Sequence, residues 1–390
     1  MTLCVFTLIA SEFMPVSLLT PVAADLGVSE GLAGQAISVS GAFAVISSLS
    51  IASLARGMDR KMLLLGMTLL MFVSAGVTAL ASNYAVYLFG RVLIGISIGG
   101  FWSLSAATAM RLVPPPDVPR ALAIFNGGNA FAMMLAAPLG SHLGSVVGWR
   151  GAFACLVPVA LVAFAWQWLS LPAMQAEASA KQPAGMQQLL RDPAVAVGMA
   201  AVAVFFMGQF ALFTYLRPFL ETVTGVDVAT LSLILLGTGV AGLVGTTLVG
   251  KVLDRGLYAP LILIPLVMAS IALALVAFGS STVAVAILLA VWGLVGTAAP
   301  VGWWTWVART MPGSAEAGGG LMVAVVQSAI ALGSAAGGLL FDISGHAATF
   351  GASAGLLVLA AGLAFLTAHR ARPAAGAEPR GGGVQGRSRS

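Results

Sequence analysis

A carboxylate stands in the middle of the first apolar stretch of the chain. Glu12, in the run Ser11-Glu12-Phe13-Met14-Pro15, interrupts an apolar segment over residues 2–20 that is long enough to cross a bilayer core of about 30 Å. A carboxylate at that depth costs about 2.5 kcal/mol or more, so we expect it to face a protein interior, hold a partner or bind a proton. Glu12 is therefore either a neutral, hydrogen-bonded acid that only joins helices or a proton-coupling site. We favour proton coupling, because no other acidic residue lies this deep in an apolar segment.

Arg91 is the second ionisable residue that falls inside an apolar segment. It shares one helical face with Gly95, Ile98 and Trp102, at the spacing i, i+4, i+7 and i+11. If the first and fourth segments cross in opposite directions, Arg91 and Glu12 lie at similar depths, and a contact between them, direct or relayed, is expected. A cation within about 4 to 6 Å favours a charged carboxylate, so Arg91 would tune proton binding. The alternative is a structural arginine bonded to backbone carbonyls.

Neutral amide and aromatic side chains are the candidate substrate groups. Asparagine and glutamine donate to and accept from a heteroaromatic edge, and tryptophan and phenylalanine stack on a planar ring. Such groups suit an uncharged, flat, polyhydroxylated solute better than an anion. For each of them the alternative is helix packing. The candidates are Gln35, Trp102, Asn126, Asn129, Phe206, Gln209, Phe213, Trp303 and Gln327.

Charged residues at two equivalent helix ends are candidate gates. Asp59-Arg60-Lys61 follows the second apolar segment, and Asp254-Arg255 follows the eighth. They are either ordinary membrane-edge charges or a gate in which aspartate meets arginine from a neighbouring helix. Arg111 is a further gating candidate at the end of the fourth segment. Pro138 and Gly140 complete the set, because they allow the fifth segment to bend and to approach its neighbours closely.

The composition places the chain in a membrane. Of its 390 residues, 59% are hydrophobic and 8% are charged, whereas about 25% charged is usual in soluble domains. Apolar windows and turn signals predict twelve transmembrane helices with no room for a soluble catalytic domain. Neither Cys4 and Cys155 nor the three histidines have metal-like spacing, and the net charge of +5 is spread over short loops. We therefore expect no enzyme, metal, cofactor or nucleic-acid partner.

The two halves of the sequence repeat each other. Arg111-Leu112-Val113-Pro114 closes the fourth segment, and Arg309-Thr310-Met311-Pro312 closes the tenth. Asp59 and Asp254 hold corresponding positions after the second and eighth segments. The predicted fold class is therefore an all-α integral membrane protein, with twelve transmembrane helices in two six-helix halves related as parallel repeats. A substrate site is expected at mid-membrane between the halves.

The loops set the predicted domain limits and orientation. Most of the 18 Lys and Arg residues fall on one side, so the positive-inside rule places both termini and the central linker in the cytoplasm. The Gly-, Arg- and Ser-rich tail is predicted to be disordered. The expected parts are a first bundle over residues 1–171, a cytoplasmic linker over 172–192, a second bundle over 193–368 and the tail over 369–390.

Four segments together resemble a known family. The chain is similar to the drug:proton antiporter (DHA1-like) branch of the major facilitator superfamily, and within it to the bacterial purine ribonucleoside efflux pumps. The similarity extends over all twelve predicted helices. The segments that carry it are Ser11-Glu12-Phe13, Gly99-Gly100-Phe101-Trp102 with the following Arg111-Leu112-Val113-Pro114, Phe213-Thr214-Tyr215-Leu216-Arg217-Pro218 and Pro300-Val301-Gly302-Trp303.

The resemblance implies a proton-coupled antiporter that exports purine ribonucleosides such as inosine and guanosine by alternating access. It associates Glu12 and Arg91 with proton coupling, and it implies a monomer of the bacterial inner membrane driven by the proton gradient. Asp59-Arg60-Lys61 is shorter than the superfamily's loop motif, and Ala137 stands where the antiporter motif has glycine. Alternatives are a multidrug or sugar exporter of the same fold, and more distantly a membrane receptor or enzyme that transports nothing.

Overall fold

The computed structural model describes residues 1–54, 58–112, 114, 118–174, 189–311 and 315–371. Within these residues the regular structure is helical, and no strand occurs. The helices of the first half are α1 (Thr2–Ser17), α2 (Leu19–Leu26), α3 (Glu30–Leu54), α4 (Arg60–Ala79), α5 (Tyr84–Arg111), α6 (Val118–Ala154) and α7 (Leu156–Ser170). Those of the second half are α9 (Pro193–Phe213), α10 (Leu216–Phe219), the π-helix η2 (Leu220–Thr224), α11 (Val228–Arg255), α12 (Tyr258–Phe278), α13 (Thr282–Gly296), α14 (Ala298–Thr310) and α15 (Ala315–Ala371).

The lengths of the apolar helices agree with twelve membrane crossings. Among the described residues nine helical runs are long and apolar enough to span a membrane, and the bent pair α1 and α2 makes ten. Two of the runs, Gly128–Ser170 and Gly318–Arg370, are 43 and 53 residues long. At 1.5 Å per residue they measure roughly 65 and 80 Å, which is enough for two crossings each.

Two glycines divide these long runs. Gly148 in α6 has φ 75° and ψ 165°, and Gly345 in α15 has φ 73° and ψ −173°. A side chain at such angles would be strained, so only glycine takes them easily. Each glycine therefore lets the chain reverse direction without a long loop, and the next crossing begins at once.

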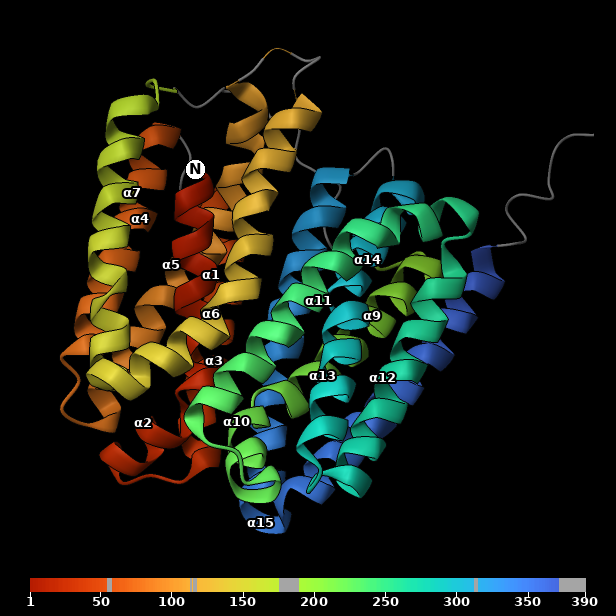
Figure 1. Cartoon of the computed structure of the whole chain (residues 1–390). Helices are drawn as coiled ribbons and strands as arrows, with labels where there is room; N and C mark the ends of the chain where they lie inside the picture. Colours follow the sequence, from red (N-terminus) through yellow and green to blue (C-terminus); the bar gives the residue numbers. More distant parts are fainter. Residues whose placement is uncertain (55–57, 113, 115–117, 175–188, 312–314, 372–390) are drawn as a thin grey trace, which may run out of the picture.

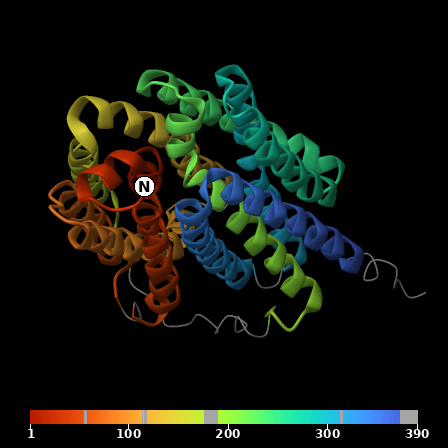
Figure 2. The same cartoon turned by 90° about the horizontal axis from the view of Figure 1, so that it is seen from below.

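The helices gather into two bundles. Figure 1 shows α1 to α7 on one side and α9 to α15 on the other, with α2 and α10 at the same edge of the molecule. The end-on view in Figure 2 shows the two bundles side by side. The halves meet mainly where α15 contacts α3 and where α11 contacts α6. We call the end that carries α2 and α10 the α2–α10 edge.

The first crossing breaks where the sequence removes backbone donors. Pro15 has no N–H, so the carbonyl of Ser11, one turn earlier, has no partner in the helix. The helix ends at Ser17, and α2 turns away by 67°. Pro21, four residues after Ser17, also has no N–H to offer that carbonyl. Two carbonyls of this crossing are therefore left for side chains of other helices.

Candidate functional site

Glu12 lies where the two halves of the molecule touch. It belongs to α1 and is only 3% exposed, so it faces the protein interior and not lipid. Gln327 of α15, itself 7% exposed, donates from Nε2 to Glu12 Oε1 at 3.3 Å. Because α1 belongs to the first half and α15 to the second, this hydrogen bond joins the halves directly.

Arg91 of α5 is fully buried, and its guanidinium binds the backbone beside Glu12. It donates from Nη1 to the carbonyl of Ser11 at 2.8 Å and from Nη2 to the carbonyl of Glu12 at 3.2 Å. Its other bonds go to the carbonyl of Ala36 at 3.5 Å and to Ser40 Oγ at 3.3 Å, both on α3. Within the described part of the chain, no ion pair joins Arg91 to the Glu12 carboxylate.

The position of Arg91 follows from a proline. Because Pro15 cannot donate to the Ser11 carbonyl, that oxygen is available in the membrane interior and a charged donor satisfies it. The Arg91 charge also acts electrostatically on Glu12 without touching its carboxylate. Arg91 thus holds the backbone of Glu12 in place, and the predicted contact between the two residues exists at the main chain.

Aromatic rings surround this contact. Phe13 of α1 stacks on Phe210 of α9, with centroids 5.7 Å apart and planes at 29°. Phe210 in turn meets Phe213 edge-on at 5.9 Å. Phe213 is a predicted substrate residue, whereas Phe13 and Phe210 were not among the predictions. Their sequence signal is adjacency, since each directly follows a residue that was predicted, Glu12 or Gln209.

The predicted substrate residues divide between the interface and the second half. Gln35 donates from Nε2 to the carbonyl of Ala335 at 3.4 Å and so joins α3 to α15. Gln209 of α9 is half-buried, and its Oε1 has no hydrogen-bond partner. Trp303 instead packs edge-on against Trp306 inside the second half, 2% exposed.

For the remaining predicted substrate residues, the structure gives less information about a role in substrate binding. Phe206, 7% exposed, meets its neighbour Phe205 edge-on at 5.3 Å within the second half. Trp102 of α5 and Asn129 of α6 are half-buried. The side chain of Asn126 lies outside those that the structure describes. The structure thus brings Glu12 together with Gln327 and links Phe213 to them through the Phe13–Phe210 stack.

Two of the predicted gate residues, Asp59 and Arg60, bind backbone groups at the start of α4 and after α7. Asp59 accepts from the amide of Lys61 at 2.7 Å, which caps the start of α4, and from the amide of Met174 at 3.1 Å. The amide of Arg60 donates to the carbonyl of Met174 at 3.0 Å. Asp59 therefore holds the chain after α7 against the start of α4. Among the described side chains it has no arginine partner.

The other gate candidates lie at different places in the two bundles. Asp254 and Arg255 are exposed at the end of α11, with no ion pair among the described residues, and the side chain of Arg111 is outside the described set. Pro138 is buried in α6. Gly140 is closer to the site, because a Cβ there would collide with Ser17 of α1. Gly140 therefore lets α6 lie against the helix that carries Glu12.

A second buried arginine joins the halves at the α2–α10 edge. Arg217 of α10 is 6% exposed, and its Nη1 donates to the carbonyl of Ser17 at the break after α1. Its Nε donates to Glu221 Oε1 at 2.7 Å within the second half. Arg217 was not predicted as a site residue. Its sequence signal was that it is one of two basic residues, with Arg150, on the side that the positive-inside rule places outward.

Asp342 and Tyr215 bind the start of α3 at the same edge. Asp342 of α15 accepts from Ser29 Oγ at 2.5 Å and from the amide of Gly31 at 2.9 Å. The Tyr215 hydroxyl donates to the carbonyl of Ser334 at 2.8 Å, and it lies 3.4 Å from the carbonyl of Gly31. A Cβ at Gly31 would collide with Asp342, so the glycine allows this approach. The α2–α10 edge is therefore closed by polar contacts between the halves.

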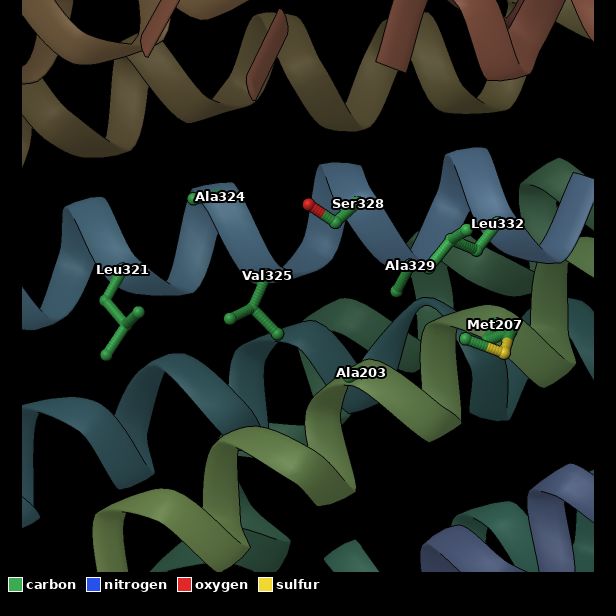
Figure 3. Close-up of a pocket in the computed structure, with 8 residues that line it drawn as sticks. All are labelled: Ala203, Met207, Leu321, Ala324, Val325, Ser328, Ala329 and Leu332. Atoms are coloured by element: carbon green, nitrogen blue, oxygen red, sulfur yellow. The ribbon is translucent and has the colours of Figure 1, made fainter. Parts of the chain in front are cut away.

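An apolar pocket of about 290 Å³ lies between α9 and α15. Figure 3 shows Val325 and Ala329 of α15 pointing toward Ala203 and Met207 of α9. Ser328 is its one polar lining side chain, and no predicted site residue lines it. A hydroxyl-rich solute would lose its hydrogen bonds there, so this pocket does not resemble a site for such a solute.

Comparisons with known proteins agree with this architecture. A family model for the Major Facilitator Superfamily matches residues 1–333. Two solved structures share the fold at 17% sequence identity: the D-xylose-proton symporter, with a TM-score of 0.77 over 93% of this chain and 95% of that one, and the human organic anion transporter MFSD10, with a TM-score of 0.67 over 93% and 98%. The predicted fold class is confirmed.

Curated relatives are similar over nearly the whole chain. The purine ribonucleoside efflux pump NepI of Salmonella typhimurium is 40% identical over 358 residues, which is 92% of this chain and 90% of the relative. The transcription regulatory protein OpdE of Pseudomonas aeruginosa is 60% identical over 374 residues, 95% of this chain and 93% of the relative. One of these relatives is thus named for transport and the other for regulation.

Proposed function

This chain belongs to the Major Facilitator Superfamily, and from that premise we propose that it exports purine ribonucleosides such as inosine and guanosine in exchange for protons. It is a multi-pass transporter of a small molecule, with bacterial efflux pumps among its relatives. The observation that carries the proposal is the buried carboxyl of Glu12 at the contact between the halves. A titratable group at that place can hold a proton in one arrangement of the halves and release it in another.

The nucleoside assignment rests on two supports. One is the efflux pump relative, whose printed name gives purine ribonucleosides as its cargo. The other is chemistry: carboxamides of Gln35 and Gln327 lie at the contact between the halves, and α9 adds Gln209 one helical turn before Phe213. Carboxamides bond the donor and acceptor edges of a purine, and an aromatic ring stacks on its face.

The loops support the proposed orientation in the membrane, and the efflux pump relative supports export as the direction of transport. The positive-inside rule puts both termini in the cytoplasm, so the α2–α10 edge faces outward. Contacts of Arg217 and Asp342 close that edge in this structure. In the proposed cycle a nucleoside enters from the cytoplasm, the outer contacts break to release it, and a proton on Glu12 accompanies the return. Arg91 keeps the Glu12 backbone in position throughout.

The test is uptake of radiolabelled inosine into inverted membrane vesicles, with and without a pH gradient. Wild-type protein should show uptake that the gradient stimulates, and Glu12→Gln should lose that stimulation while remaining folded, because glutamine cannot carry the proton. A matched control is Asp192→Asn, which neutralises an exposed carboxylate at the start of α9 while asparagine can keep the cap that Asp192 makes. Gradient-driven uptake at the wild-type rate in Glu12→Gln would refute the coupling role.

Cargo class is tested separately from coupling. Cells that express a nucleoside exporter should resist toxic purine nucleoside analogues and remain sensitive to lipophilic cations. A multidrug exporter of the same fold would give the opposite pattern. A sugar exporter would protect against neither class, and labelled sugar would enter the inverted vesicles instead of inosine.

The name of one relative favours a second candidate function, an effect on transcription. An exporter can produce such an effect without touching DNA, because it lowers the cytoplasmic concentration of a small molecule that a regulator senses. Transcript levels in a deletion strain carrying Glu12→Gln separate the two cases. Loss of regulation together with transport supports an indirect effect, whereas regulation that persists in this variant supports a separate regulatory activity.

A further inference from the structure

The carboxamide of Gln327 uses its donor but not its acceptor. Its Nε2 donates to Glu12 Oε1 at 3.3 Å, while its Oε1 is buried with no partner. A carboxamide presents a donor and an acceptor side by side. A neutral carboxylic acid presents the matching acceptor and donor, whereas a carboxylate presents acceptors only. Protonated Glu12 therefore complements Gln327 with two parallel hydrogen bonds, and ionised Glu12 leaves one acceptor unpaired.

The existing bond between Gln327 and Glu12 is longer than a typical hydrogen bond. Typical N–H to oxygen bonds are about 2.9 to 3.0 Å, and bonds to an ionised partner are shorter still. The Gln327 to Glu12 distance of 3.3 Å is longer than both. The unpaired Gln327 Oε1 next to this contact fits a hydroxyl donor from the neutral acid.

The backbone on both sides of the contact is held in place. Arg91 binds the carbonyls of Ser11 and Glu12, which fixes α1 at this level. On the other side, Gly41 of α3 lies so close to α15 that a Cβ there would be 3.0 Å from the carbonyl of Gln327. Because the backbone of both residues is positioned independently, their side-chain chemistry decides whether the contact forms.

Few other charges reach Glu12. Among the described residues, Arg91 of α5 is the charged group that acts on Glu12, and no second described charge of α5 does so. Of the other helices packed against α1, α10 brings Arg217 to Ser17, beyond the end of the helix. From α3, α4, α6, α7 and α15, no described side chain acts on Glu12 through a charge. Among the described residues, Arg91 is therefore the charge nearest to Glu12 in effect, and Gln327 is the side chain that hydrogen-bonds its carboxyl.

We propose that Gln327 is a positioning residue that makes contact between α1 and α15 depend on the proton held by Glu12. This inference rests on the proposed function. A proton from the outer aqueous side binds Glu12 Oε2, and the new O–H donates to Gln327 Oε1 while Gln327 Nε2 continues to donate to Glu12 Oε1. Release of that proton to the cytoplasm removes the O–H donor and leaves two acceptor oxygens facing each other. The halves then separate more easily at this level, which is the arrangement that admits substrate.

The experiment measures conformation against pH in substrate-free, full-length protein in lipid nanodiscs. Exposed Cys155 is first replaced by serine, and spin labels are placed at Ser82 and Ser280, exposed residues of the first and second halves. Distances between the labels are recorded by pulsed electron resonance over a pH series. Wild-type protein should change its distance distribution with a single pH midpoint, and Glu12→Gln should remove that change.

Variants of Gln327 should move the midpoint in opposite directions. Gln327→Leu removes the partner of protonated Glu12, so the midpoint should fall by about one pH unit, the equivalent of one hydrogen bond. Gln327→Glu adds a second carboxyl beside Glu12. Two neighbouring carboxylates repel each other, which favours the protonated form, so the midpoint should rise. Gln167→Leu is the matched control, since Gln167 is a buried amide of α7 that bonds Thr68 and not Glu12. Its midpoint should equal that of the wild type.

The outcomes separate this inference from the proposed function. An unchanged or raised midpoint in Gln327→Leu overturns the role of Gln327, while proton coupling stands if Glu12→Gln still removes the pH response and gradient-driven uptake. If Glu12→Gln changes neither, the proposed function itself fails. If Gln327→Leu does not elute as folded protein, the direction of the Gln327→Glu shift decides, because a lowered midpoint there overturns the inference.

Discussion

Two buried arginines use the same backbone chemistry with different results. Arg91 binds the carbonyl of Ser11, which Pro15 cannot serve, and Arg217 binds the carbonyl of Ser17, which Pro21 cannot serve. Both oxygens belong to the first crossing. Arg91 comes from the same half as its acceptor, whereas Arg217 comes from the other half. One arginine therefore fixes helices within a bundle, and the other joins two bundles.

The partners of the two arginines explain why the bond from Arg217 to Ser17 can break during transport and the bonds of Arg91 cannot. Arg91 is completely buried, and its four acceptors are neutral oxygens of α1 and α3. It would lose all of them at once if it moved. Arg217 keeps an ion pair with Glu221 in its own half at 2.7 Å, so it stays partnered when it leaves Ser17. A buried charge can switch helices only if it carries a counter-ion with it.

The largest effect is expected for Arg91→Met. Methionine is similar in length but donates nothing, so the carbonyls of Ser11 and Ala36 lose a buried partner, which we expect to destabilise the fold by about 3 kcal/mol or more. Thermal unfolding followed by size-exclusion chromatography in detergent measures it. Arg91→Lys should be intermediate, since it keeps the charge with fewer directed donors. An unfolding temperature equal to that of the wild type would show that Arg91 is not structural.

A smaller and different effect is expected for Arg217→Met. The protein should remain folded, but the open arrangement of the α2–α10 edge should become about tenfold more populated, as loss of one charged hydrogen bond implies. The label pair at Ser82 and Ser280 reports it. Glu221→Gln should not increase the open population, because it removes the counter-ion that Arg217 keeps on opening and leaves the donor to Ser17. An unchanged distance distribution in Arg217→Met would mean that this bond does not hold the edge closed.

The smallest effect is expected for Pro15→Ala. Alanine returns an N–H to the Ser11 carbonyl, so stability should change by less than about 1 kcal/mol, because that oxygen is satisfied either way. In the Pro15→Ala background, Arg91→Met should lower the free energy of unfolding by about 1 kcal/mol less than it does in the wild type. The reason is that the Ser11 carbonyl then keeps a backbone donor. Equal costs in the two backgrounds would contradict the link between the proline and the arginine.

Local patterns account for the parts of the site that were predictable. The burial of Glu12 follows from its place in a long apolar run, and the cap that Asp59 makes on α4 is a rule about neighbouring residues. The gate role proposed for Asp59 needed an arginine from another helix, which no local pattern supplies. Arg217 and Asp342 escaped prediction for the same reason, because their acceptors and donors lie on the opposite half.

By itself, the sequence determined that this chain is a helical membrane protein with two repeated halves and a carboxyl buried in its first crossing, because hydropathy, turn residues and charge are properties of each segment alone. Only the tertiary structure decided that Gln327, 315 residues away, is the partner of Glu12, and that Arg91 meets its backbone and not its carboxylate. The physical reason is that hydrogen bonds between helices depend on which faces meet and at what depth. Close packing of the whole bundle sets both.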